Sequence, residues 1–312
     1  MSRESEKFMK QLQKYLDEND TGDLTDEEFN ELTDRFFAEH QGETVEAGPL
    51  KPEDAKTSDD FLELAEDNQE NAQLCRKYAE KALALDPDNL DAELLLTDLN
   101  YPRDGSPEKR LDRDEEVVAK GREIMARLGV RDGNYWVDVT TRPFMRALER
   151  YAMDCYYYGM HRKSMALMEE MLVKNPDDSQ AVRWTLIVLY MVFEEEEKAE
   201  KLLAAYTENG DESALLLGMA DLKFRLGKFD EAKSFLQRLL NVNPGTKKFF
   251  RTVCEDSREL RSYRDMPFLK PFTLEELASS YENAIDLYDS SFAFFLWGNK
   301  ALSGMKAQKK AK

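Results

Sequence analysis

The sequence predicts an all-α protein that is built from repeated helical hairpins. Its 312 residues include only 14 glycines and 10 prolines, and this scarcity favours helices because both residues disrupt helix interiors. No stretch shows the alternation of β-branched and polar residues that is typical of a half-buried strand. Gly159 and Gly227 stand 68 residues apart, as do Pro176 and Pro244, and this distance equals two periods of 34 residues.

An N-terminal helical hairpin is predicted over residues 1–40. Apolar side chains recur at helical spacing over residues 8–16, and Thr25 and Glu28 are spaced as a capping box that opens the second helix. Residues 41–57 contain glycine, proline and several acids, which predicts an acidic linker.

The segment between these two helices resembles the calcium-binding loop of the EF-hand family. That loop needs oxygen ligands at its first, third, fifth, seventh and twelfth positions, with glycine at the sixth. With Gly22 at the turn, the matching residues are Asp17, Asn19, Thr21, Asp23 and Glu28. The resemblance implies a calcium site. The alternative is a capped hairpin without metal, because EF-hands usually occur in pairs, no second loop is found and Glu28 also fits the capping box.

Residues 58–134 are predicted to form helical hairpins of less regular spacing. Residues 74–85 have the pattern of an amphipathic helix that stops before Pro87. The period then breaks, because Pro176 follows Pro87 by 89 residues. The surplus lies in a loop and in residues 111–128, which we interpret as a long inserted helix.

Residues 135–246 are predicted to form three regular hairpins that begin near Met145, Gln180 and Ser213. Their second helices carry small residues at matching places, namely Ser164, Ala199 and Ala232. With a small residue at the turn and proline after the second helix, this pattern resembles the tetratricopeptide-repeat (TPR) family. The resemblance implies a right-handed α-solenoid of the kind that binds other proteins.

Three residues depart from the pattern of that family. Arg183 and Lys223 are charged where apolar side chains are usual, and Glu194 replaces the glycine found at the turns of the neighbouring hairpins. The geometry of the middle turn is therefore left open.

Residues 247–304 are predicted to be C-terminal capping helices. Thr273 and Glu276 have the spacing of a second capping box, and residues 287–302 are strongly apolar. The last repeat of a solenoid leaves an apolar face bare, so we interpret this region as the cover of that face. The alternative is a docking surface or a dimer contact. The basic residues 305–312 are predicted to form a disordered tail.

The charge of the chain bears on its partners and its location. The formal net charge is −19, and residues 1–100 contain 28 acidic and 10 basic residues. Such a surface repels phosphate backbones, so we expect no nucleic-acid partner. The three cysteines show no paired spacing, and we find neither a signal peptide nor an apolar run near the ~20 residues of a membrane span. We expect a cytoplasmic protein that does not associate with membranes, and the sequence leaves its oligomeric state open.

No motif of catalysis stands out in the sequence. Its two histidines, His40 and His161, lie outside any metal-binding or nucleophile motif, and no glycine-rich phosphate loop is found. We therefore expect no enzymatic activity, and no cofactor unless the calcium site is real.

The TPR resemblance also implies a binding surface. First helices of that family line a concave groove, and the side chains expected to face it here are Arg146, Glu149, Met153, Tyr156, Trp184, Val188, Met191, Leu217, Asp221 and Phe224. Methionine and aromatic side chains suit an amphipathic helix of a partner protein. The alternative is that the chain fills this groove itself, with its N-terminal hairpin or its C-terminal helices.

These observations predict a non-catalytic scaffold for protein–protein interaction that binds a peptide or helix in the groove. The alternative is a calcium-responsive adaptor, in which metal binding at residues 17–28 orders the N-terminal hairpin.

Overall fold

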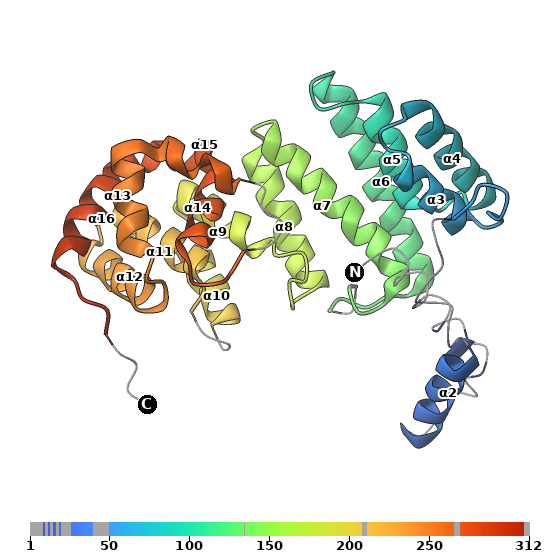
Figure 1. Ribbon diagram of the computed structural model, residues 1–312, viewed down its shortest axis with the longest axis horizontal. Helices are drawn as coiled ribbons and strands as arrows, with labels where there is room; N and C mark the ends of the chain where they lie inside the picture. Colours follow the sequence, from blue (N-terminus) through green and yellow to red (C-terminus); the bar gives the residue numbers. More distant parts are fainter. Residues whose placement is uncertain are drawn as a thin grey trace. The chain divides into compact units, whose positions relative to one another are not determined.

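The computed structural model shows a helical protein. It describes residues 50–133, 135–207, 211–264 and 269–308, the helix at 26–39, and residues 9, 12, 15, 16 and 19. All regular secondary structure in these residues is helical, which confirms the predicted all-α class (Figure 1). The chain divides into two compact units, Met1–Ser179 and Gln180–Lys312. The boundary falls between the first and the second of the three regular hairpins.

Near the N-terminus, helix α2 spans Asp26–Glu39. Its Phe36 is buried, and the Phe36 ring lies 5.3 Å from the ring of Tyr15, centroid to centroid. Residues on either side of the predicted loop therefore pack together, as expected for a helical hairpin.

Three further hairpins make up the rest of unit 1. They pair α3 (Ser58–Asp67) with α4 (Ala72–Leu85), α5 (Leu90–Asn100) with α6 (Pro107–Leu128), and α7 (Arg142–Tyr157) with α8 (His161–Lys174). A short 3₁₀ helix, η1 (Val139–Thr141), precedes α7. Each helix from α3 to α7 packs against the next one along the chain, and α5 also packs against α7 (Figure 1).

The long helix α6 starts and ends where its residues dictate. Pro107 lies in the first turn, where its missing N–H is harmless, and Gly129 ends the helix in the left-handed conformation. Gly121 lies in its middle, where a Cβ atom would stand 2.4 Å from the ring of Phe144. Glycine at this position lets α6 and α7 approach closely.

Unit 2 contains two hairpins and a C-terminal group of helices. The hairpins pair α9 (Arg183–Phe193) with α10 (Glu196–Tyr206) and α11 (Ser213–Arg225) with α12 (Phe229–Val242), and α9 packs against α11. The C-terminal group consists of α13 (Thr246–Asp256), η2 (Ser257–Tyr263), α14 (Leu274–Glu282), α15 (Ile285–Tyr288), η3 (Asp289–Ser291) and α16 (Phe292–Gly304).

The C-terminal helices cover the end of unit 2. Helix α16 packs against α11, α12 and α13, and Phe294 and Phe295 of α16 are buried. The ring centroids of Phe250 and Phe295 lie 5.4 Å apart, in an aromatic cluster that also includes Tyr281. These helices therefore bury an apolar face of the hairpins before them, while Phe292 remains exposed.

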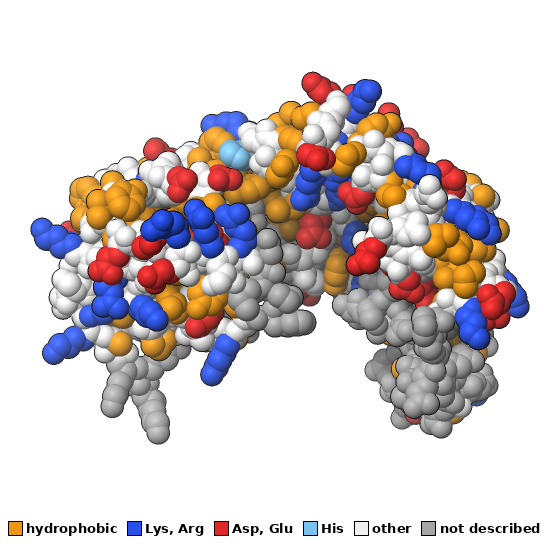
Figure 2. All heavy atoms as spheres, turned by 45° about the horizontal axis from the view of Figure 1, so that its top comes forward, with side chains coloured by type: hydrophobic (Ala, Val, Ile, Leu, Met, Phe, Trp, Pro, Cys, Tyr) orange, Lys and Arg blue, Asp and Glu red, His pale blue; other side chains and the backbone are white. Residues whose placement is uncertain are grey.

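The surface of the described helices mixes charged and apolar side chains. On the face drawn in Figure 2, acidic and basic groups alternate, with hydrophobic side chains between them. No helix in the described part of the chain is long and apolar enough to cross a membrane.

The turn inside each regular hairpin repeats the same backbone conformation. Gly159, Glu194 and Gly227 have φ angles of 78°, 57° and 73°. The small residues that follow each turn, Ser164, Ala199 and Ala232, are fully buried. Glu194 thus keeps the left-handed turn of its neighbours, although a side chain with a Cβ atom is strained in that conformation.

We expect Glu194→Gly to raise the free energy of unfolding by about 1 kcal/mol, because glycine adopts the left-handed conformation without that strain. Urea denaturation measures the change. Glu194→Ala is the matched control, since it removes the exposed carboxylate but keeps the Cβ atom. Equal stabilisation by both variants would show that the charge, and not the backbone, is responsible.

Candidate functional site

An open groove of about 650 Å³ lies in unit 2. It is bounded by α9 and the residues before it, the start of α11, residues 269–272, and α14 with the residues that follow. Three aromatic residues line it, namely Trp184, Phe272 and Tyr288, together with small residues that include Ala181, Ala214 and Ala284. Its volume falls in the range of sites that bind a small molecule or a large side chain.

Trp184 is held in place at the edge of this groove. Its indole N–H donates a hydrogen bond of 2.7 Å to Glu212, yet 46% of the residue is exposed. Arg183 bridges to the same carboxylate at 3.0 Å, and its guanidinium lies 4.8 Å from the centre of the Trp184 ring system. The charge of Arg183 is therefore explained, because this side chain orients Glu212 and Trp184 instead of entering the core.

Asn243 fixes the opposite wall of the groove. Its buried side-chain amide donates to the carbonyl of Thr273 at 2.9 Å and to the hydroxyl of Ser213 at 3.1 Å. Gly245 allows the backbone to come close here, since a Cβ atom on it would lie 2.6 Å from the backbone nitrogen of Leu274. The turn after α12 and the start of α11 thus hold the N-terminus of α14.

Glu276 completes this arrangement. The Thr273 hydroxyl accepts a hydrogen bond from the Glu276 N–H, and the Glu276 carboxylate accepts from the Phe272 N–H at 2.6 Å and from the Ser213 hydroxyl at 2.8 Å. Burial raises the pKa of Glu276 above its usual value, although these hydrogen bonds oppose the shift. The predicted cap at Thr273 is confirmed. The Glu276 carboxylate in turn accepts a hydrogen bond from the N–H of Phe272, the residue before the cap.

The ten residues predicted to line a partner groove are divided between the two units. Arg146, Glu149, Met153 and Tyr156 belong to α7 of unit 1, where they are half-buried. Arg146 donates two hydrogen bonds to Asp91 of α5, at 2.8 and 2.6 Å. Its guanidinium therefore joins α5 to α7.

The predicted groove residues of unit 2 require a correction. Four of these side chains are buried and therefore offer no continuous open surface to a partner, namely Val188, Met191, Leu217 and Asp221. The C-terminal helices cover them: α15 packs on α9, α14 and α16 pack on α11, and the Ser291 hydroxyl contacts the Met191 sulfur at 3.7 Å. Of the ten, only Trp184 and Val188 line the open groove.

Phe224 and Asp221 show how this covering works. The Phe224 ring lies 5.1 Å from that of Trp297 and 5.6 Å from that of Phe294, centroid to centroid, both in α16. Burial raises the pKa of Asp221 to about 6, although Arg225 lies 3.3 Å away and favours the carboxylate. These two residues serve the contact with the C-terminal helices.

Lys223 also has a structural explanation. Its buried ammonium pairs with Glu196 and Glu200 at 2.5 Å and with Glu231 at 2.9 Å. Burial disfavours the ammonium, but these ion pairs outweigh that effect and raise the pKa of Lys223. The three carboxylates are close enough together to hold a metal ion, yet the lysine already supplies their positive charge.

The predicted calcium site lies mostly outside the described residues. This holds for Asp17, Thr21, Asp23 and the side chain of Glu28. Asn19 is described: it is helical, and its amide donates to the carbonyl of Tyr15 at 2.7 Å. Calcium binding at residues 17–28 therefore stays a prediction.

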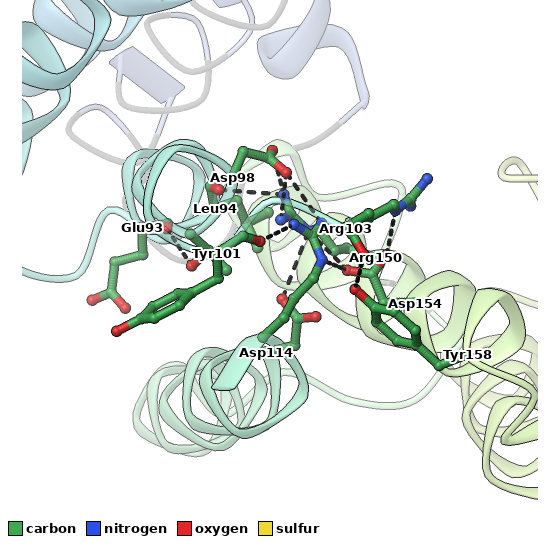
Figure 3. A network of polar contacts seen from close by, with 11 residues as sticks. Glu93, Leu94, Asp98, Tyr101, Arg103, Asp114, Arg150, Asp154 and Tyr158 are labelled. Atoms are coloured by element: carbon green, nitrogen blue, oxygen red, sulfur yellow. Dashed lines mark hydrogen bonds and ion pairs between the residues drawn. The ribbon is translucent and has the colours of Figure 1, made fainter. Parts of the chain in front are cut away.

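A second polar cluster lies inside unit 1, between α5, α6 and α7 (Figure 3). Asp154 of α7 is fully buried and accepts hydrogen bonds from Arg110 at 2.5 Å and from Arg103 at 2.6 Å. Arg110 also reaches Asp98 of α5 at 3.1 Å, and Arg150 donates to the same carboxylate at 2.6 Å. These arginines link three helices through two carboxylates.

Asp114 is the member of this cluster that lacks a close hydrogen-bond donor. Neither of its carboxylate oxygens has a hydrogen-bond partner at ordinary distance among the described residues, and Arg150 Nε lies 3.6 Å from the nearer one. Burial, and then the interaction with Asp154, raise the pKa of Asp114 to about 7. Burial also opposes ionisation of Asp154, but its contacts with Arg110 and Asp114 outweigh that effect and lower its pKa. Because both carboxylates are closed off from solvent, we assign the cluster to helix packing.

Asp114→Asn should remove a pH dependence of stability. The folded chain holds the Asp114 proton more tightly than the unfolded chain, so stability falls as pH rises from about 4 to about 7, by up to about 1.4 kcal/mol per pH unit. Asparagine does not ionise, so the variant should gain stability relative to the wild type at about pH 8 and not at about pH 4. Urea denaturation at both values measures this, with the exposed Asp112→Asn as control. An equal pH dependence in wild type and Asp114→Asn would contradict the assignment.

Sequence reasoning found only part of the groove. Trp184 was expected from its place in the repeat, and Glu276 was expected only as a capping residue. The sequence marks Ser213 only as the start of a hairpin and does not indicate that Ser213 and Asn243 hold the groove wall, because these roles depend on contacts between segments about 30 residues apart or more.

Comparisons with known proteins do not add to this description. No protein-family model matches the chain, and no curated protein matches it. The function is therefore argued from the groove and the fold.

Proposed function

We propose that this protein is a non-catalytic scaffold that binds a peptide or helical segment of a partner protein in the groove beside Trp184. The observation that carries the proposal is a half-exposed tryptophan, fixed by Glu212 and Arg183, at the edge of an apolar groove. Tryptophan is among the residues that contribute most to binding energy at protein interfaces.

The repeated hairpins support a scaffold role. The shared left-handed turns at Gly159, Glu194 and Gly227, with a buried small residue after each, are what a TPR-like α-solenoid requires. Stacked hairpins of this kind bind partners with the side chains of their first helices. Trp184 lies on such a first helix, α9.

The shape of the groove suggests what part of a partner enters it. Alanines leave space between Trp184 and Tyr288, so a large apolar side chain can insert there and bury its surface. The expected contact is smaller than a groove running along the whole array, because the C-terminal helices already cover Met191, Leu217 and Asp221. One anchoring side chain with its flanking residues fits this space.

Trp184→Ala tests the proposal. A library of short random peptides displayed on phage is selected against the full chain, and enriched peptides are titrated by calorimetry into wild type and variant. We expect enriched peptides to carry a large apolar residue and to lose about 10-fold or more in affinity with Trp184→Ala.

Phe229→Ala is the matched control. Phe229 is as exposed as Trp184 but does not line the groove, so its removal should leave the affinity unchanged. The proposal fails if no enriched peptide depends on Trp184, or if both variants weaken binding equally.

The calcium-responsive alternative rests on the sequence pattern at residues 17–28. It is tested by calorimetric titration of calcium into the full chain and into Glu28→Gln. If the loop binds the ion, the wild type should give saturable heat that the variant lacks, since the twelfth position supplies two ligand oxygens. Absence of heat at millimolar calcium would remove this alternative.

A further inference from the structure

We infer that the groove beside Trp184 recognises a positively charged side chain, so that the bound segment presents a lysine or arginine next to its apolar anchor. This inference rests on the proposed function and specifies the partner. It depends on the pairing of Glu276, the charges around the groove and the position of Phe272.

Glu276 has no cationic partner among the described residues. Its hydrogen-bond donors there are the Ser213 hydroxyl, the N–H groups of Phe272 and Thr273, and the Asn243 amide, and all of them are neutral. Burial makes the carboxylate costly to ionise, and the nearby carboxylate of Glu212 adds to that cost. A half-buried carboxylate of this kind is stabilised when a cation reaches it.

The other charges around the groove do not meet this need. Among the described residues that line it, Glu212 and Glu276 are acidic and none is lysine or arginine. Glu212 is already paired with Arg183, whose guanidinium also faces the Trp184 ring. Glu276 is therefore the acidic residue of the lining that is left for a cation from outside.

Phe272 lines the same groove as Glu276. Its N–H donates to Glu276, its backbone is held in the left-handed conformation at a φ of 61°, and its side chain is exposed. The groove therefore combines an unpaired carboxylate with exposed aromatic surface. Lysine and arginine side chains suit this combination, because their charge binds the carboxylate while their stems and charge also contact aromatic rings.

The same geometry disfavours acidic segments. A carboxylate or phosphate in the groove would face Glu276 and Glu212 with no basic residue of the described lining to offset the repulsion. The groove should therefore select between partner segments by the sign of their charge.

Glu276→Gln tests the inference with the peptides selected on the wild-type chain. The expected result is that Trp184-dependent peptides are enriched in lysine or arginine, and that they lose about 10-fold or more in affinity with Glu276→Gln. Glu275→Gln is the matched control, because it removes the same charge from the same turn of α14 without touching the groove, and it should leave affinity unchanged.

A second measurement guards against misfolding of the variant. Each enriched peptide is resynthesised with its lysine or arginine replaced by glutamine and is titrated into the unaltered chain, where the same loss of affinity is expected. The inference is overturned if Trp184-dependent peptides carry no basic preference, or if neither Glu276→Gln nor the peptide replacement weakens binding. In those cases the proposed function stands. Absence of any Trp184-dependent peptide overturns both.

Discussion

Unit 2 depends on how its C-terminal helices cover the apolar face of the hairpins before them. After α12 the chain forms α13 and returns through α14, α15 and α16, which pack on α9, α11 and α12. Aromatic side chains such as Phe250 and Phe295 fill the contact. Burying these rings stabilises the unit, and it also removes most of the surface that an open array would offer to a partner.

The groove beside Trp184 is what this return of the chain leaves open. Hydrogen bonds at the N-terminus of α14 position one wall of this groove, with Asn243 and Ser213 on one side and Glu276 at the start of the helix. The same hydrogen bonds that fix the wall of the groove hold the half-buried Glu276 carboxylate in its lining. Glu276 is therefore both a residue that stabilises the start of α14 and the candidate recognition group.

Buried charge is handled differently in the two units. In unit 2, the ammonium of Lys223 is paired with three glutamates, so a charge at a core position is fully compensated. In unit 1, three arginines share Asp98 and Asp154, but Asp114 remains without a close donor. A buried carboxylate without a close donor is costly, so protonation has a large effect at Asp114. Glu276 is half-buried and has only neutral donors among the described residues, so a cationic ligand can act there.

By itself, the sequence determined the helical class and indicated the turns at Gly159 and Gly227, because these follow from composition and local spacing. Gly159, Gly227 and the small residues after them mark each turn within a few residues of chain. Only the tertiary structure decided which side chains are accessible. Met191 and Asp221 look like groove residues in sequence, yet they are covered by segments more than 60 residues away. Local sequence patterns likewise did not predict the conformation of Glu194 or the partners of Lys223 and Glu276. The interactions of a charged side chain depend on groups that only the folded chain brings close to it.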